Sequence, residues 1–254
     1  FWVSGLCSPW QTFAQRAEKL IKAYHSREPE RVQGVVNTAF GELFKTKGDA
    51  PNWEEVYETR DLTPRRIMPG WVSLVTCGVD VQKRGLYYVI RGWGANNRSH
   101  LYDHGYINGE TEFDEVWMLL QRMISQTVDG KLFIHNTFID SGYTPGRDGY
   151  RRPDHKVYEF CRRTQGRAYP TKGHDIQDRP LKASKIDVTI RGSTFKGGIT
   201  LWHIDTDHFK SWLHAQIQLP LGADRLWTTH AEIDEDYCRQ IVSEEVVVKP
   251  SGKR

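Results

Sequence analysis

Hydrophobic and polar positions follow different patterns in the two parts of this chain. Over the first 60 residues, apolar side chains recur every three or four positions, which is typical of amphipathic helices. One such stripe begins at Phe13, and Ser8 followed by Pro9 predicts a capped helix start in front of it. A second short helix is expected over residues 30–40.

From Trp71 onward, short apolar runs rich in β-branched and aromatic residues predict strands. Helical periodicity returns between these runs, most clearly over 112–126, where the apolar residues form a single stripe. No apolar run approaches the length of a membrane-spanning helix. The expected strands are 72–81, 86–93, 101–107, 131–139 and 167–170, with a long hairpin over 185–204, and the expected helices are 112–126, 154–164, 207–218 and 234–243.

The order of these elements predicts the fold class. Three consecutive strands followed by a helical crossover to a fourth strand is the order of ribonuclease H-like folds, in which the fourth strand lies parallel to the first. We therefore expect an α/β fold, a ribonuclease H-like mixed sheet flanked by helices, over residues 67–254. Residues 1–66 are expected to form a short helical linker segment in front of it.

The composition is that of a globular protein with a core. Hydrophobic residues make up 38% of the chain, and the nine tryptophans argue against disorder. The four cysteines lie far apart and form no C-x-x-C pair, so neither a disulfide framework nor a zinc knuckle is expected. The chain starts without methionine and without a signal peptide. We expect a piece of a longer protein that works in a reducing cytosol.

Positive charge is concentrated in one segment of the chain. Between Arg147 and Lys196 there are 13 Lys and Arg residues against 6 Asp and Glu, although the whole chain carries only +3. A phosphate backbone favours such a segment; a solvated surface with spare lysines is the alternative. The long hairpin over 185–204 is a candidate DNA clamp or regulatory element, and a β-extension without a function is its alternative. The candidate DNA-binding residues are Arg147, Arg151, Arg152, Lys172, Arg191 and Lys196.

Two aspartates, Asp80 and Asp140, each close an apolar run that predicts a buried strand. A carboxylate in that position is costly to desolvate without a cation or hydrogen-bond donors. On neighbouring strands the two would also repel each other, so together they indicate a divalent metal site. The alternatives are that Asp80 caps the turn over 83–85 and that Asp140 forms an Asx turn.

Such a pair supports phosphodiester hydrolysis. At neutral pH this reaction requires an activated water and neutralisation of charge on the attacking and leaving oxygens. Two Mg²⁺ or Mn²⁺ ions about 3.5–4 Å apart do both, and these hard ions prefer carboxylate oxygen. We expect Asp80 to bridge the two ions, because it lies on the central strand, and Asp140 to bind one of them.

A third carboxylate is expected near the start of the helix over 207–218. Asp205 and Asp207 are the candidates there. The structural alternative for Asp207 is a helix N-cap. Lys210, one helical turn further on, would approach a phosphate or hold a carboxylate, and an ordinary exposed lysine is its alternative.

Other chemistries find little support in the sequence. His203 and His208 lie near no thiol, and their spacing matches no common zinc pattern; His135 and His174 are expected to be structural. Ser141 lacks the glycine on both sides that a nucleophile elbow needs. There is no G-x-x-x-x-G-K-[ST] motif, so no ATP site of the P-loop type is expected in this chain.

Several short motifs add up to a family resemblance. GVDVQ at 78–82 is similar to a first nuclease strand, DSGY at 140–143 to a second acidic motif, and Asp207 with Lys210 to an acidic-lysine motif late in the domain. In this combination the chain resembles the C-terminal nuclease part of the phage terminase large subunit of the GpA (lambda-like) family, over nearly its whole length. Further similar stretches are 8–10, 36–42, 157–161 and 172–173.

The resemblance implies a metal-dependent endonuclease domain of a viral genome-packaging motor, which cuts concatemeric double-stranded DNA in the host cell cytoplasm. The ATPase domain of the same polypeptide would lie outside this chain, in line with the missing P-loop motif. The terminase small subunit and the portal protein are the implied partners, with no membrane involved. By this resemblance Asp80, Asp140 and Asp207 are the metal ligands, and Lys210 joins the catalytic set.

Two other functions stay open at this point. A ribonuclease H-like recombinase would need a specific DNA-binding module, and the sequence contains no evident helix-turn-helix or zinc finger. A non-catalytic module that docks the packaging motor on DNA and the portal would show no metal-dependent effect of Asp80→Asn.

Overall fold

The computed structural model describes residues 4–26, 29–41, 50–142, 153–175, 177–190, 193–219 and 226–243. It divides the chain into two units, one formed by residues 1–50 with 245–254 and the other by residues 51–244. Among the described residues, no helix is long and apolar enough to cross a membrane.

The first unit is helical in its described part. The helix start predicted at Ser8 is wrong, because Thr12 caps the first long helix: its hydroxyl accepts from the Gln15 amide at 3.2 Å, and Gln15 Oε1 accepts from the Thr12 amide at 2.9 Å. The last turn ends at Gly41, whose φ of 64° is left-handed. The elements are η1 (Gly5–Cys7), α1 (Phe13–Ser26), α2 (Pro29–Val35) and the π-helical turn η2 (Val36–Phe40).

Strand β1 (Leu74–Gln82) is the centre of the second unit. Every second side chain from Val75 to Val81 is buried, and the side chains between them are more exposed, as a pleated strand with two different faces requires. The buried side chains form one core with helices α4 (Asp114–Ser125) and α5 (Pro153–Arg163). One face of the sheet is therefore sealed by these two helices.

Seven further strands join β1 in one sheet. They are β2 (Gly85–Trp93), β3 (Ser99–Asn108), β6 (Asn136–Asp140), β7 (Ala168–His174), β8 (Leu181–Ile190), β9 (Ser193–Asp205) and β10 (Trp227–Thr228). Their order is β10-β3-β2-β1-β6-β7-β9-β8. The β1–β2, β2–β3 and β8–β9 pairs are antiparallel, whereas β6 is parallel to β1 and β7 is parallel to β6. The expected α/β class, with a ribonuclease H-like mixed sheet flanked by helices, is confirmed.

Two details of the strands differ from expectation. The strand predicted over 131–139 is divided into β5 (Leu132–Phe133), which pairs with β4 (Thr127–Val128) in a small separate sheet, and β6. The predicted hairpin over 185–204 is longer, because β8 and β9 extend from Leu181 to Asp205.

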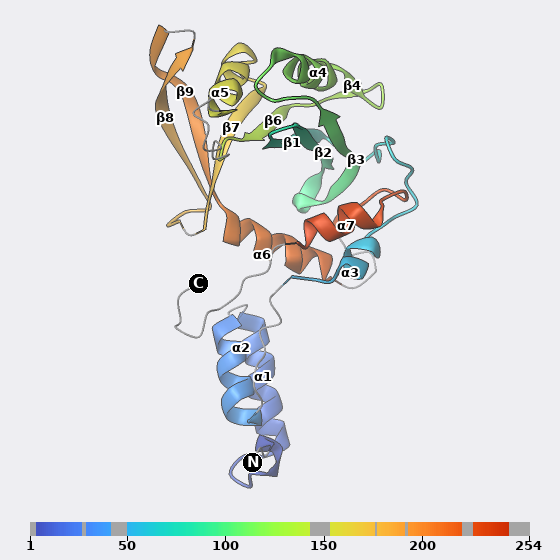
Figure 1. Cartoon of the computed structure of the whole chain (residues 1–254). Coiled ribbons are helices and arrows are strands. Elements are labelled where there is room, and N and C mark those ends of the chain that lie inside the picture. Colours follow the sequence, from blue (N-terminus) through green and yellow to red (C-terminus); the bar gives the residue numbers. More distant parts are fainter. Residues whose placement is uncertain are drawn as a thin grey trace. The chain divides into compact units, whose positions relative to one another are not determined.

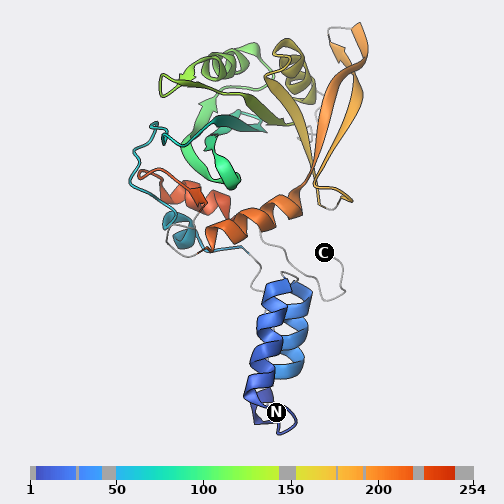
Figure 2. The same ribbon diagram turned by 180° about the vertical axis from the view of Figure 1, so that it is seen from behind.

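The other face of the sheet is covered only in part. Helices α3 (Trp53–Tyr57), α6 (Thr206–Ile217) and α7 (Glu235–Ile241) lie on the side opposite α4 and α5 (Figures 1 and 2). Their buried residues form a second core with Leu101 of β3 and Trp227 of β10. Gly78 and Asp80 of β1 and Phe138 of β6, further along the same face, remain exposed. This open part of the face carries the candidate site.

Candidate active site

Asp140 is the last residue of β6, and Asp80 lies two residues before the end of the neighbouring parallel strand β1. The register of β1 and β6 aligns Val79 with Ile139, the residues immediately before the two aspartates. Because successive side chains of a strand alternate between its faces, both carboxylates point away from the core under α4 and α5. Asp80 is exposed and Asp140 is half-buried. The structure thus brings the two predicted carboxylates together.

Among the described residues, the acidic pair of Asp80 and Asp140 is held by hydrogen bonds and not by ion pairs. Asp80 accepts a hydrogen bond from Gln82 Nε2 at 2.7 Å, and Asp140 Oδ1 accepts from the Gly142 amide at 3.0 Å. Burial raises the pKa of Asp140, and the negative charge of Asp80 raises it further, against the opposing effect of the Gly142 amide. Neither carboxylate forms an ion pair with a described Lys or Arg side chain. A divalent cation would neutralise this charge.

The structure contains the Asx turn expected as an alternative for Asp140 but not the turn cap expected as an alternative for Asp80, within the described residues. The Gly142–Asp140 hydrogen bond is the Asx-type turn that the sequence allows, so this turn and the pairing with Asp80 coexist. Asp80 accepts no hydrogen bond from residues 83–85 within the described part of the chain, where its partner is Gln82. Carboxylate oxygens at an open strand end are a donor set that suits Mg²⁺ or Mn²⁺, and two of them leave coordination positions for water and phosphate oxygens.

Asp207 and Lys210, on α6, are not grouped with Asp80 and Asp140 into a three-ligand site. Within the described residues, no group of three or more His, Cys, Asp or Glu side chains is placed to hold a metal ion. The N-cap of α6 is Asp205, whose Oδ1 accepts from the His208 amide at 2.9 Å. The N-cap alternative for Asp207 is therefore wrong, because β9 runs on to Asp205 and α6 starts directly after it. Asp207 is half-buried in the first helical turn, with Lys210 one turn further on.

The histidines of this region form a hydrogen-bonded chain. His174 Nε2 lies 2.8 Å from His203 Nδ1, and His203 Nε2 lies 2.8 Å from the Ser184 hydroxyl. Burial and the neighbouring His174 lower the pKa of His203. Both ring nitrogens of His203 are thus engaged with protein partners that link β7, β9 and β8. His135 is also engaged, because its Nδ1 accepts from the Val75 amide at 3.2 Å.

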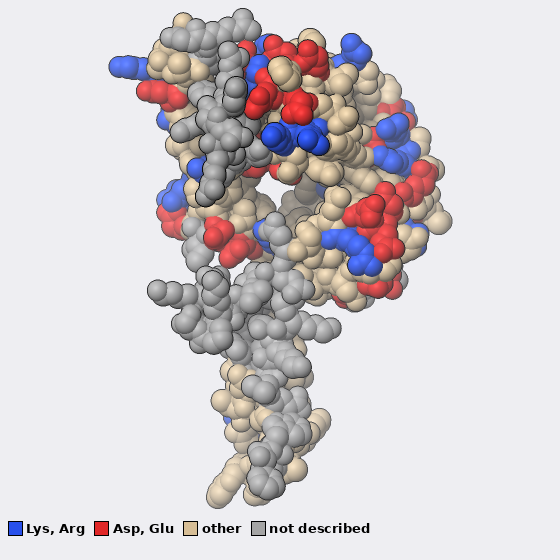
Figure 3. All heavy atoms as spheres, in the orientation of Figure 1, with Lys and Arg blue, Asp and Glu red and all other residues tan. Residues whose placement is uncertain are grey.

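A cavity of about 670 Å³, here called the aromatic cavity, opens on the same face of the sheet as the acidic pair. Thr171 in its wall is the register partner of Asp140, and Phe138 precedes Asp140 by two residues. In the space-filling view, the surface is hollowed between the sheet and α6 (Figure 3). The sequence patterns did not identify this cavity, because it combines residues from four strands and a helix. Its lining residues are Asn136, Phe138, Tyr169, Thr171, Leu181, Trp202, Ile204 and Phe209.

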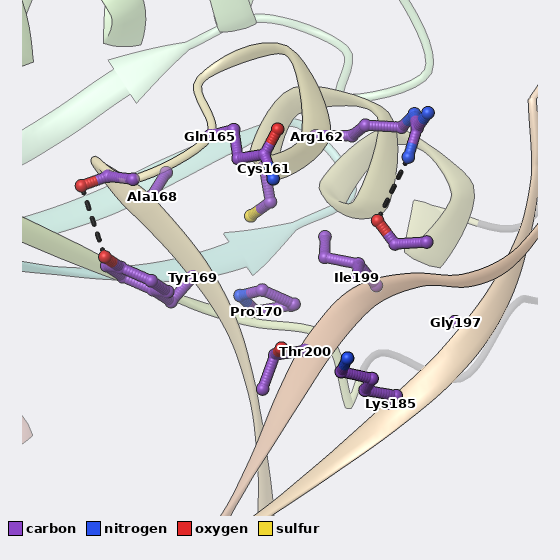
Figure 4. A pocket seen from close by; sticks show the side chains of 12 residues that line it. Cys161, Arg162, Gln165, Ala168, Tyr169, Pro170, Lys185, Gly197, Ile199 and Thr200 are labelled. Carbon is purple, nitrogen blue, oxygen red and sulfur yellow. Dashed lines mark hydrogen bonds between the residues drawn. The ribbon is translucent and has the colours of Figure 1, made fainter.

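A second cavity, of about 410 Å³, lies between α5 and the β8–β9 hairpin (Figure 4). Arg162 donates from Nη1 to the Gly198 carbonyl at 3.1 Å, and its guanidinium carbon lies 3.8 Å from the centre of the Phe195 ring. Lys185 lines the same cavity. Arg162 thus fastens the hairpin to α5, and the cavity is a feature of that junction.

Two of the six candidate DNA-binding residues lie in the described part of the chain. Lys172 is exposed on β7, and its charge lowers the pKa of Asp140, which places positive charge near the acidic pair. Lys196 is exposed on β9. On the face seen in Figure 3, acidic and basic side chains of the described residues are interspersed. Arg147, Arg151, Arg152 and Arg191 lie outside the described residues.

The fold and the site define a class of protein: an α/β domain of ribonuclease H-like order with an acidic pair near the carboxyl ends of adjacent parallel strands. Comparison with known families narrows this class. The chain matches, over residues 1–254, the family described as "Terminase large subunit gpA, endonuclease domain". It belongs to this family, and the resemblance drawn from its motifs is confirmed.

Two curated proteins are similar to the chain. The "Terminase, large subunit" of Enterobacteria phage P21 is 23% identical over 255 residues, which cover 95% of this chain and 37% of that protein. The "Terminase, large subunit" of Escherichia phage lambda is 24% identical over 223 residues, with 85% and 32% covered. The chain therefore spans about a third of the length of these relatives. No solved structure matches it significantly.

Proposed function

We propose that this chain is the nuclease of a genome-packaging terminase and that it hydrolyses phosphodiester bonds of concatemeric double-stranded DNA with divalent metal ions. The observation that supports this most strongly is the acidic pair, Asp80 and Asp140, which has no cationic side-chain partner among the described residues. Membership of a family described as an endonuclease domain supports the same reading.

Each residue of the site has a role in this proposal. Asp80, on the central strand, and Asp140 would hold the Mg²⁺ or Mn²⁺ ions through their carboxylate oxygens. Gln82 and the Gly142 amide hold the two carboxylates in place through their hydrogen bonds. When bound, the ions supply water activation and neutralise charge on the phosphate oxygens.

Asp207 and Lys210 are the proposed completion of the site. Both lie at the start of α6, on the same side of the sheet as the acidic pair. Asp207 would add a carboxylate ligand, and Lys210 would contact the phosphate. DNA would be held by Lys172 near the pair, together with Arg147, Arg151, Arg152, Arg191 and Lys196.

The remaining partners follow from the family rather than from the site. We propose that residues 1–66 link the nuclease to an ATPase domain of the same polypeptide, and that the terminase small subunit and the portal protein are further partners. The place of action would be the host cell cytoplasm.

Cleavage of a supercoiled plasmid in Mn²⁺, Mg²⁺ or EDTA tests the proposed nuclease. The chain is compared with Asp80→Asn and Asp140→Asn, and Asp236→Asn serves as the matched control because Asp236 is an exposed aspartate on α7. Metal-dependent nicking that is kept in the control and lost in the two site variants is expected. Nicking in EDTA, or full activity of either site variant, would contradict the proposal. DNA binding without any cleavage would favour a docking module, and strand joining would favour a recombinase.

A further inference from the structure

We propose that the aromatic cavity binds unpaired nucleobases of the DNA strand whose phosphate lies at the acidic pair. This inference rests on the nuclease function proposed above and adds a ligand to it: DNA whose strands are locally separated. Four lines of observation support it, namely exposed apolar surface, the row of aromatic rings, continuity with Asp140, and the polar groups of the wall.

Large apolar side chains are left open to solvent in the aromatic cavity. Phe138, Leu181 and Phe209 expose 37%, 49% and 38% of their surface, and Tyr169 and Trp202 are half-buried. Apolar side chains that are exposed together in one contiguous patch mark an interaction site or a ligand-binding groove. The volume of about 670 Å³ falls within the range of roughly 300–1,000 Å³ that small-molecule pockets have.

The lining is dominated by flat rings that suit bases. The ring centres of Phe138 and Tyr169 lie 6.0 Å apart, with 30° between the ring planes. Trp202 follows on the next strand, β9, where it is the register partner of Thr171. Proteins bind unpaired bases without sequence preference by stacking them on such rings. In a duplex both faces of each base are already stacked, so only an unpaired or flipped base can enter.

The aromatic cavity continues directly into the acidic pair. Phe138 and Asp140 are two residues apart on one face of β6, a separation of about 7 Å along a strand. Thr171, in the cavity wall, lies beside Asp140 in register. A nucleotide whose phosphate is held at Asp140 can therefore place its base in the cavity.

Polar groups at the wall match the rest of a nucleotide. Asn136 and Thr171 bring an amide and a hydroxyl to an otherwise apolar lining, and these groups can bond to base edges. Lys172 follows Thr171 on β7, so its side chain leaves the strand on the other face, from which its charge still acts on Asp140. An apolar peptide would use the rings but would have no need of the amide and the hydroxyl in the wall.

The test is a set of DNA-binding measurements in EDTA with the whole 254-residue chain. Fluorescence anisotropy is recorded with a single-stranded oligonucleotide, a duplex with an unpaired tail, and a blunt duplex. The variants are Trp202→Ala and Trp202→Phe, and the control is Phe113→Ala, because Phe113 is an exposed aromatic residue at the start of α4 on the other side of the sheet. Trp202→Ala is expected to weaken binding of the first two ligands by about 5- to 100-fold. Trp202→Ala should change the affinity for the blunt duplex by less than about threefold. Trp202→Phe and Phe113→Ala should change the affinity for each of the three ligands by less than about threefold.

Unchanged single-strand affinity of Trp202→Ala would overturn the proposal, and so would an equal loss for the blunt duplex. If Trp202→Ala fails to fold, Phe209→Ala takes its place, because Phe209 lies on the exposed side of α6. Photo-crosslinking with a 5-iodouracil oligonucleotide should label Phe138, Tyr169 or Trp202, and labelling confined to other parts of the chain would contradict the site. These readouts need no divalent ion. They therefore separate failure of base binding from failure of the nuclease, which Asp80→Asn tests through cleavage.

Discussion

Asp103 and Asp140 lie in the same sheet, but only Asp103 is paired with positively charged side chains among the described residues. Asp103 on β3 is only 5% exposed, and it forms ion pairs with Arg65 Nε at 2.6 Å and Arg66 Nε at 2.8 Å. Asp140 is more open, has no ion pair with a described side chain, and lies beside Asp80. A buried carboxylate needs compensation. The chain supplies it at Asp103 with two arginines, whereas at Asp140 we propose that a bound divalent cation would supply it.

The surroundings of Asp103 also contain neutral histidines. The His104 and His230 rings are stacked with their centres 5.6 Å apart, and His230 is fully buried. Burial lowers the pKa of His230 to about 4, and the electrostatic interaction with the His104 ring acts in the same direction. We call Asp103, His104 and His230 the structural cluster. At neutral pH its carboxylate is paired and its histidines are uncharged, in contrast to the open acidic pair.

The largest expected effect is the loss of cleavage in Asp80→Asn and Asp140→Asn. Each substitution removes a proposed metal ligand, so the initial rate of plasmid nicking should fall by about 100- to 1,000-fold. Far-ultraviolet circular dichroism should show that both variants stay folded. A reduction of less than about tenfold would place the metal site elsewhere.

Asp103→Asn should show the reverse pattern. The substitution leaves Arg65 and Arg66 without their carboxylate, and the free energy of unfolding should fall by about 2–4 kcal/mol. Urea denaturation measures this, with Asp236→Asn as the exposed control that should change stability by less than about 0.5 kcal/mol. Unchanged stability of Asp103→Asn would remove the contrast between the two aspartates.

Acid should weaken the structural cluster as the pH falls from about 6.5 to about 4, a range that lies mostly above the pKa values of ordinary carboxylates. The unfolded chain binds a proton on His230 near the ordinary pKa of about 6.5, whereas the folded chain does so only near 4, so stability falls as the pH drops between these values. The full effect is up to about 3 kcal/mol. Urea denaturation at several pH values should give a shallower pH dependence for His230→Gln, and an unaltered slope would contradict this assignment.

The smallest expected effect is a slight stabilisation by Asp140→Asn in EDTA. Removing the charge relieves the repulsion from Asp80 and the cost of partial burial, so the Tm should rise by about 1–3 °C. Differential scanning calorimetry measures this change. A fall in Tm would mean that Asp140 is stabilised by its surroundings, as Asp103 is.

The sequence was most informative where periodicity is strong. The apolar runs that end at Asp80 and Asp140 predicted both aspartates, and the element order predicted the parallel pairing of β1 and β6. The start of a helix was harder to predict, because Ser8 and Thr12, like Asp205 and Asp207, have equivalent capping chemistry. Which of the two residues caps the helix depends on where the preceding segment of the backbone ends and the helix begins.

Contacts between residues distant in sequence could not be predicted from one chain. Asp103 is paired with arginines 37 and 38 positions away, and no local pattern distinguishes it from the other aspartates. The aromatic cavity likewise brings Phe138 next to Tyr169 and Trp202 only through the order of β6, β7 and β9 in the sheet. Such sites follow from topology rather than from periodicity.

The central claim is that the acidic pair is a divalent cation site, and a Mn²⁺ titration followed by electron paramagnetic resonance tests it most directly. The unmutated chain and Asp236→Asn should bind Mn²⁺ with the same affinity, whereas Asp80→Asn and Asp140→Asn should lose that binding while remaining folded. Equal Mn²⁺ binding by all four proteins would contradict the account.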